Sequence, residues 1–174
     1  LRDVTGWGLE RPMRQRERDI QAGRAHYSES LPVEYRPTDA YLDAYERALS
    51  RHAGVVASGV QALAEAVAER GDDPILVSLA RAGVPIGVLV RDALRSRGIA
   101  APHYALSVVR DRGVDEVALD AIVAAHGDRG IRFIDGWTGK GTIAAEMRRS
   151  VERYNASRGR RIDPGLWVIS DPLG

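Results

Sequence analysis

The sequence predicts an α/β fold in which helices cover both faces of a parallel sheet. Between residues 75 and 169, short apolar runs alternate with longer segments of helical spacing. Apolar runs such as 75–79 are typical of strands buried on both faces. Strands joined through helices pair in parallel with right-handed crossovers, so the alternation indicates a parallel sheet. The 174 residues, 44% of them hydrophobic, are enough for one domain with its own core.

Residues 1–38 precede this pattern and are rich in Arg, Gly and Pro. We expect them to form an N-terminal arm that lies on the main body, with one helix-like stretch at 14–22. The division is therefore an arm, 1–38, and an α/β domain, 39–174. Because the chain begins at Leu1 rather than Met and ends directly after an apolar run, we expect it to be part of a longer protein.

A long helix opens the α/β domain. From Asp39, a predicted N-cap, apolar residues recur at helical spacing to Val67, which predicts one long helix or two joined near Gly54. The elements expected after it are, in order, a strand at 75–79, a helix after 81–85 that ends near Gly98, a strand at 103–109, a helix at 115–126, a strand at 131–134, a helix at 142–157 and a strand at 166–169.

The charge pattern gives no general preference for nucleic acid or for a membrane. The formal net charge is +1, and Arg is interleaved with Asp and Glu along most of the chain, whereas nucleic-acid binding requires a concentrated basic face. The Arg-rich stretch at 11–24 is interrupted by Glu17 and Asp19, which favours a solvated helix face. We therefore expect a small-molecule ligand and neither nucleic acid nor a membrane as partner, and a homodimer is left open.

The sequence contains no cysteine. This excludes disulfides, thiolate zinc sites and a cysteine nucleophile from this polypeptide. No signal-peptide pattern opens the chain, and no apolar run approaches the roughly 20 residues that a membrane-spanning helix needs. These observations predict a cytoplasmic location.

The most informative feature is a single lysine, Lys140, in a glycine-rich loop ahead of a predicted helix. The other 24 of the 25 basic residues are Arg. A compact ammonium can reach a phosphate among backbone amides where a planar guanidinium is too wide. Asp135, at the end of the preceding strand, can hold sugar hydroxyls or a metal. The predicted phosphate-binding residues are Thr138, Gly139, Lys140, Gly141 and Thr142.

Two further loops are expected at the same edge, because ligands bind beyond the carboxyl ends of parallel strands. The segment 110–115 is polar and carries Arg110 and Arg112, but by itself it fits a solvated turn better than a binding loop. The loop after 75–79 has small residues that let amides approach an anion, and an Arg that can bind phosphate oxygens, although a plain strand-to-helix turn fits it equally well alone. Its predicted binding residues are Ser78, Arg81, Ala82 and Gly83.

Two nucleotide-binding motifs are excluded by spacing. A P-loop needs Gly, four residues and then Gly-Lys-Ser/Thr, but Ile134 stands at the first position and Gly141 follows the lysine. A dinucleotide fingerprint, Gly-x-Gly-x-x-Gly, could begin at Gly139, but its third glycine is replaced by Ala144.

The segment 131–142 resembles the binding loop for phosphoribosyl pyrophosphate in the type I phosphoribosyltransferases, one residue shorter. Asp135 matches the first of the two acids of that loop, whereas Gly136 stands where the second would be. The resemblance implies that 81–87 is the pyrophosphate loop and that 110–115 is the flexible catalytic loop. It also implies a type I phosphoribosyltransferase-like fold with a variable hood for the acceptor, formed by the arm or by residues beyond Gly174.

A closer resemblance, over nearly all of the chain, is to the bacterial stress and tellurium-resistance-associated StiP family. It is carried by the strings at 16–23, 26–29, 77–83, 103–104 and 135–141. The family has two competing labels, a phosphoribosyltransferase-like domain and a cysteine protease. The protease label has no cysteine nucleophile in this sequence.

The resulting hypothesis is a phosphoribosyltransferase in a bacterial stress-resistance context. Phosphoribosyl pyrophosphate would bind with its phosphate at 138–142 and its pyrophosphate at 78–83, with Mg²⁺ held mainly by the substrate rather than by protein ligands. The ribosyl phosphate would pass to an unknown, base-like acceptor. The expected catalytic residues are Asp135, on a ribose hydroxyl, and Arg110 and Arg112, which would close over the departing charge.

Two alternatives are left open. A sensor that binds a nucleotide or sugar phosphate without turnover is favoured by Gly136 at the position of the second acid. A hydrolase or protease would need a nucleophile from an absent part or from Ser and His here, although each His is more often structural. Trp137 is more easily interpreted as a packing residue, but within the loop it could stack on a substrate ring.

Overall fold

The computed structural model describes residues 6–172, so the first five residues of the predicted arm and the last two of the chain lie outside the described residues. The chain divides into two compact units, Leu1–Ser50 and Arg51–Gly174. The boundary falls within one long helix, α2 (Asp39–Ala68).

The first unit contains short elements. β1 (Glu10–Arg11) pairs in parallel with β2 (Leu31–Pro32), and between them lie α1 (Met13–Gln21) and the 3-10 helix η1 (Tyr27–Glu29). The helix predicted at 14–22 is confirmed with a shift of one residue, whereas β1, β2 and η1 were not expected.

The long helix α2 is continuous, so the alternative of two helices joined near Gly54 is wrong. Its N-cap is Thr38 rather than Asp39, because the Thr38 hydroxyl accepts a hydrogen bond from the Tyr41 amide at 3.3 Å. Within the second unit, α2 buries one stripe at helical spacing, formed by Val60, Leu63, Ala64 and Val67.

The second unit is built on a four-stranded parallel sheet, as the sequence predicts. Its strands are β3 (Ile75–Leu79), β4 (His103–Leu106), β7 (Ile131–Asp135) and β8 (Leu166–Val168), in the order β4-β3-β7-β8. Each neighbouring pair is parallel. The central strand β3 is buried along its whole length, which explains its mainly apolar sequence.

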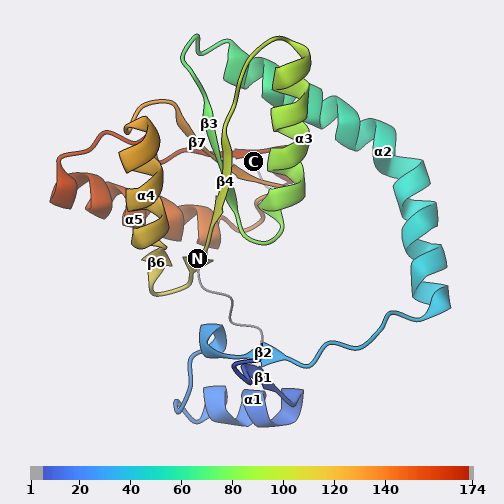
Figure 1. Ribbon diagram of the computed structural model, residues 1–174. Coiled ribbons are helices and arrows are strands. Elements are labelled where there is room, and N and C mark those ends of the chain that lie inside the picture. Colours follow the sequence, from blue (N-terminus) through green and yellow to red (C-terminus); the bar gives the residue numbers. More distant parts are fainter. Residues whose placement is uncertain (1–5, 173–174) are drawn as a thin grey trace. The chain divides into compact units, whose positions relative to one another are not determined.

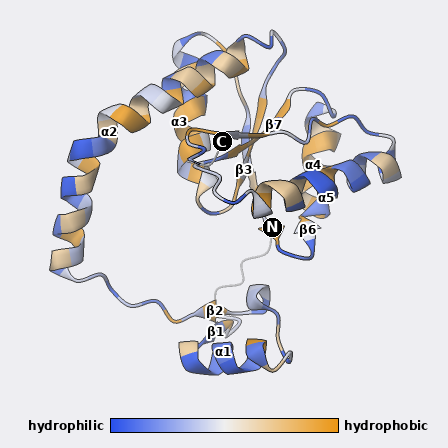
Figure 2. Cartoon of the chain, turned by 180° about the vertical axis from the view of Figure 1, so that it is seen from behind, coloured by the Kyte–Doolittle hydropathy of each residue, from blue (hydrophilic) through white to orange (hydrophobic). Residues whose placement is uncertain are grey.

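Helices cover both faces of this sheet (Figure 1). The second half of α2 and α3 (Gly83–Ser96) pack with Leu76 and Ile134. On the opposite face, α4 (Glu116–His126) and α5 (Thr142–Arg158) pack with Val77 and Phe133. Figure 2 shows hydrophobic colouring on the strands of the sheet and on the helices that flank it, such as α3 and α4, in agreement with a core on each side of the sheet.

The strand predicted at 103–109 is shorter than expected. β4 ends at Leu106, and β5 (Val108–Val109) forms an antiparallel hairpin with β6 (Gly113–Val114). Asp111, at φ 66°, and Gly113, at φ 85°, allow the turn. Gly113 also packs closely against α5, since a Cβ there would lie 2.3 Å from the Ser150 hydroxyl.

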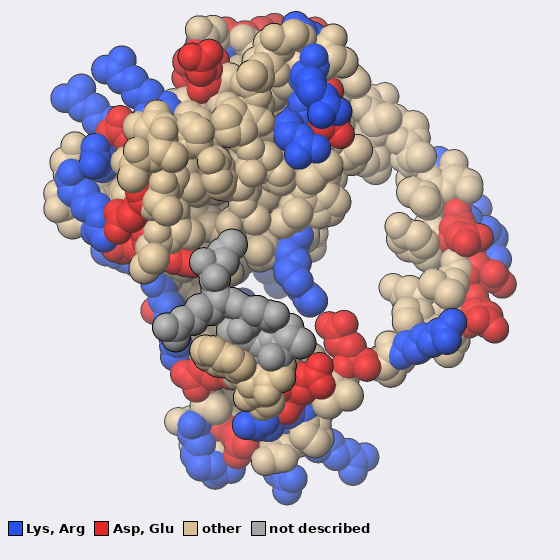
Figure 3. Space-filling view, viewed as in Figure 1, with Lys and Arg blue, Asp and Glu red and all other residues tan. Residues whose placement is uncertain are grey.

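None of the helices in residues 6–172 is both long enough and apolar enough to cross a membrane. Basic and acidic side chains are interspersed on the face of the molecule shown in Figure 3.

Candidate functional site

The sheet has its topological switch point between β3 and β7. The connection that leaves β3 leads to β4 on one side, whereas the connection that leaves β7 leads to β8 on the other. Open parallel sheets bind ligands at the carboxyl ends of the two strands where such connections diverge. The relevant loops are therefore 80–82, after β3, and 136–141, after β7.

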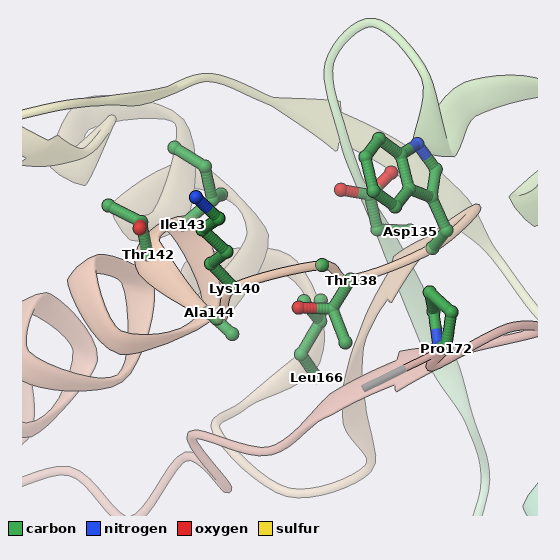
Figure 4. Close-up of a pocket in the computed structure, with 11 residues that line it drawn as sticks. Asp135, Thr138, Lys140, Thr142, Ile143, Ala144, Leu166 and Pro172 are labelled. Carbon is green, nitrogen blue, oxygen red and sulfur yellow. The ribbon is translucent and has the colours of Figure 1, made fainter. Parts of the chain in front are cut away.

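A cavity of about 620 Å³ lies at the loop after β7. All six residues predicted to bind or act there, Asp135 and 138–142, line this cavity together. In Figure 4, Lys140 and Thr142 lie on one side of it, Asp135 and Pro172 on the other, with Thr138 between. Within residues 6–172 the lining is Asp135, Trp137, Thr138, Gly139, Lys140, Gly141, Thr142, Ile143, Ala144, Leu166 and Pro172.

The backbone at this cavity favours an anion. Gly141 precedes α5 in the left-handed conformation, φ 73°, and among the described residues no side chain caps the helix and no acid lies in its first turn. The amides of a first helical turn have no intrahelical partner and carry the positive end of the helix dipole. The Thr138 amide is an exception within the predicted nest, because it donates to the Ser170 carbonyl at 3.1 Å.

Asp135 ends β7 at the edge of the cavity. Partial burial raises the pKa of its carboxyl group, and the Gly136 amide, which donates to Oδ1 at 2.7 Å, opposes this effect. The amide also fixes the orientation of the carboxylate. A charged, oriented and partly desolvated acceptor of this kind suits the hydroxyls of a sugar.

The loop after β3 packs against the end of β7. A Cβ at Gly83 would lie 2.5 Å from the Ile134 carbonyl oxygen and 3.1 Å from Asp135 Cα. Arg81 and Ala82 are exposed on this loop, and the Ala80–Arg81 peptide bond is cis. The predicted residues Arg81, Ala82 and Gly83 are thus next to the cavity but are not part of its lining.

Ser78 differs from the other predicted binding residues. It is fully buried within β3, and its hydroxyl is hydrogen-bonded to His103 Nε2 at 2.7 Å. Gly87 of α3 permits this arrangement, since a Cβ there would lie 2.1 Å from the Ser78 oxygen. The structure therefore directs this hydroxyl into the packing beneath α3 and not to the cavity.

The pair formed by Ser78 and His103 has the distance of a nucleophile and its base. Burial, and secondarily the positive charge of Arg91, lowers the pKa of His103, so the ring is held neutral. The serine, however, is 0% exposed, so a substrate cannot reach it. The pair is best explained as a satisfied polar contact in the core.

Two further histidines also have structural contacts. His26 caps η1, where its Nδ1 accepts a hydrogen bond from the Ser28 amide. His126, at the end of α4, is hydrogen-bonded to the Tyr104 hydroxyl at 2.7 Å.

Arg110 and Arg112 lie at the exposed turn of the β5–β6 hairpin and are not among the residues that line the cavity. Both make contacts within the chain. The Ser150 hydroxyl accepts a hydrogen bond from the Val114 amide at 3.0 Å, which anchors the base of the hairpin to α5. Their closure over a reacting group stays a prediction.

The apolar side of the cavity was not predicted from the sequence. Leu166 and Pro172 line the cavity because β8 pairs with β7. The sequence near Lys140 does not indicate this pairing. Ile143 follows the predicted phosphate loop directly and could have been included, since the first turn of α5 was expected to face the ligand.

The proteins to which this chain is similar include a solved structure and a curated relative. The structure is described as "Crystal Structure of a Hypothetical Protein from Neisseria gonorrhoeae with bound ppGpp", with a TM-score of 0.43 and 14% identity, over 67% of this chain and 78% of that one. A likeness of this degree carries no argument about the present chain. The relative is "Cysteine protease StiP" of Acinetobacter baylyi, 42% identical over 161 residues, which are 92% of this chain.

The chain spans only 42% of the length of that relative. The family described as "Tellurite-like stress resistance cysteine protease StiP" matches residues 1–174, the whole chain. Since both comparisons agree, the chain belongs to the StiP family of stress-resistance proteins.

Proposed function

We propose that this part of a StiP protein is a type I phosphoribosyltransferase-like domain that binds phosphoribosyl pyrophosphate or a related sugar phosphate. One observation carries the proposal: the only lysine of the sequence and Asp135 line one cavity at the uncapped start of α5. The strand order β4-β3-β7-β8 supports the same assignment, because the cavity lies at the loop after β7, one of the two strands at the switch point.

The sugar phosphate would span the cavity. Its phosphate accepts hydrogen bonds from Lys140 Nζ and from the amides at the start of α5, where the helix dipole also favours negative charge. Its ribose hydroxyls donate to Asp135, whose carboxylate is already oriented by the Gly136 amide. The pyrophosphate then lies toward Arg81 on the neighbouring loop, which reaches the end of β7 through Gly83.

Transfer would proceed by departure of pyrophosphate from C1 of the ribose, with the electron pair of the broken C–O bond. A nitrogen of the base-like acceptor forms the new bond to C1 and releases its proton to solvent. The transition state has oxocarbenium character, so the chain's contribution is to stabilise the departing negative charge, for which Arg81, Arg110 and Arg112 are the candidates.

The donor set fits Mg²⁺ held chiefly by the substrate. Asp135 is the only carboxylate in the cavity lining, and within residues 6–172 no group of three or more His, Asp or Glu could hold a metal. Mg²⁺ often binds through one or two carboxylates together with substrate phosphates. When bound, the ion neutralises the pyrophosphate charge.

Two observations bear on the alternative functions, a sensor and a protease. Gly136 in place of a second acid removes one ribose contact and favours a sensor that binds without turnover. The cysteine protease named in the family description would need a cysteine from outside this sequence, which has none, and the Ser78–His103 pair of this chain is buried.

Isothermal titration calorimetry with phosphoribosyl pyrophosphate and Mg²⁺ tests the proposal. Lys140→Ala should weaken binding about tenfold to a hundredfold, since a hydrogen bond to a charged group contributes about 1.5–3 kcal/mol. The matched control is Arg148→Ala, which removes an exposed cation from α5 outside the cavity and should leave affinity unchanged. Equal affinity of the wild type and Lys140→Ala would refute the site.

Pyrophosphate release distinguishes the enzyme from the sensor. With Mg²⁺ and a panel of purine and pyrimidine bases, a transferase releases pyrophosphate in a base-dependent manner. A sensor binds the sugar phosphate with the same dependence on Lys140 but releases none.

A further inference from the structure

Trp137 is an exposed aromatic residue in the middle of the predicted phosphate loop. Its side chain is 62% exposed, and it lines the same cavity as Lys140. Trp167, by contrast, is partly buried and lies within 6.0 Å of both the Arg70 and the Arg132 guanidinium groups. The indole of Trp137 therefore has a large face that the packing of the chain leaves accessible.

The indole of Trp137 lies close to the backbone of Gly139. A Cβ at Gly139 would lie 2.9 Å from Cζ3 of Trp137 and 3.7 Å from Cη2. Gly139 is not among the glycines with positive φ, so the backbone conformation does not require glycine there. A side chain at this position would instead push the exposed ring away from the loop. The indole thus packs against the backbone at Gly139.

The cavity has two chemical characters. One part is polar and cationic, with Lys140 and the start of α5, whereas Ile143, Leu166, Pro172 and the indole supply apolar surface. A sugar phosphate alone has no apolar face to meet this surface. The volume of about 620 Å³ lies within the range of sites for organic ligands much larger than a phosphate.

We propose that the cavity binds a nucleoside 5′-phosphate, with the phosphate at Lys140 and the aromatic base stacked on Trp137. This inference rests on the proposed function, because it uses the same phosphate site. In a transferase the stacked base is the acceptor and later part of the nucleotide product. In a sensor the nucleotide is the ligand itself.

Three probes separate the two parts of the site. AMP carries both phosphate and base, ribose 5-phosphate lacks the base, and adenosine lacks the phosphate. Stacking of a base on an aromatic side chain is worth about 1–3 kcal/mol, or about fivefold to a hundredfold in affinity. Calorimetry should therefore show AMP binding tighter than ribose 5-phosphate by that factor, and adenosine binding weaker than AMP.

Variants assign the difference to the indole. Trp137→Ala should reduce AMP affinity to the level of ribose 5-phosphate and leave the affinity for ribose 5-phosphate unchanged within about twofold, while Trp137→Phe keeps most of the preference. Trp7→Ala is the matched control, because Trp7 is 60% exposed and lies outside the cavity. Since Trp137 is exposed, both alanine variants should melt at the wild-type temperature.

The outcomes are distinguishable. If AMP and ribose 5-phosphate bind the wild type equally, or if Trp137→Ala weakens both to the same extent, the stacking site is refuted while the phosphate site stands. If neither probe nor phosphoribosyl pyrophosphate binds, the proposed function fails, and the stacking site fails with it.

Discussion

The units β3-α3 and β7-α5 have the same plan, a largely buried five-residue strand followed by a loop and a helix, yet the loops differ: the loop of β7-α5 lines the cavity at Lys140, and the loop of β3-α3 is not in that lining. Three residues, 80–82, join β3 to α3, and Gly83 then packs against the end of β7. Six residues, 136–141, join β7 to α5 and enclose the space beside Lys140. The two loops therefore differ in length and in the contact that the start of the following helix makes.

The glycines of the two loops serve different purposes. Gly83 permits a backbone contact, Gly139 makes room for an indole, and Gly141 supplies a positive φ. The glycines of a glycine-rich loop can therefore be needed for different structural reasons. Substitution at each position should therefore have a different effect.

The largest effect is expected at Gly83. A Cβ there would meet the Ile134 carbonyl oxygen at 2.5 Å, and this backbone cannot move aside easily. Gly83→Ala should lower the free energy of unfolding by about 1–3 kcal/mol, measured by urea denaturation.

Two controls define this prediction. Gly54→Ala replaces a helical glycine with nothing within 4 Å, so it should stabilise by up to about 1 kcal/mol. Gly139→Ala meets only the end of the Trp137 side chain and should cost little stability. A Gly83→Ala variant as stable as Gly139→Ala would show that the contact between the loops is not tight.

Substitution of Asp135 should have opposite effects on ligand affinity and on stability. Burial raises the pKa of its carboxyl group, so the folded state binds the proton more tightly than the unfolded state. Stability therefore falls as the pH rises from the ordinary aspartate pKa through the raised one. At pH 7, Asp135→Asn should melt at or above the wild-type temperature, and this advantage should shrink as the pH falls through that window.

The Asp135→Asn variant should also bind phosphoribosyl pyrophosphate about tenfold or more weakly, because a charged acceptor is lost. A variant that melts below the wild type at pH 7 would contradict the cost assigned to burial.

The smallest effect is expected at His103, on β4, whose ring is hydrogen-bonded to Ser78 of β3. Burial lowers its pKa, so the unfolded state binds the proton more tightly and stability is lost as the pH falls below the ordinary histidine value of 6.5. The melting temperature of the wild type should drop between pH 7.5 and pH 5.5, and His103→Gln should drop less. If the melting temperatures of the two proteins fall by the same amount over this pH range, His103 has an ordinary pKa and the prediction is wrong.

Local patterns in the sequence predicted most of this architecture. β3 was predicted at its observed bounds, and β7 and α5 extend by only one residue beyond the predicted 131–134 and 142–157. The residues of the phosphate loop were also predicted to lie together, because they are contiguous and follow a buried strand. Such features depend on neighbours in sequence.

Contacts between distant residues were not predictable. The hydrogen bond between Ser78 and His103 joins residues 25 positions apart, and it turned a predicted binding residue into a buried one. The hairpin after Leu106 depends on the close fit of Gly113 against α5. Leu166 reaches the cavity only through the pairing of β7 with β8. In each case the deciding partner lies on another element of the fold.

A crystal structure of the chain soaked with phosphoribosyl pyrophosphate and Mg²⁺ tests the central claim most directly. We expect density for a phosphate group within about 3 Å of Lys140 Nζ and of the amides at the start of α5, with the ribose beside Asp135. Ligand density elsewhere on the chain, with the space beside Lys140 empty, would contradict a sugar-phosphate site at this loop.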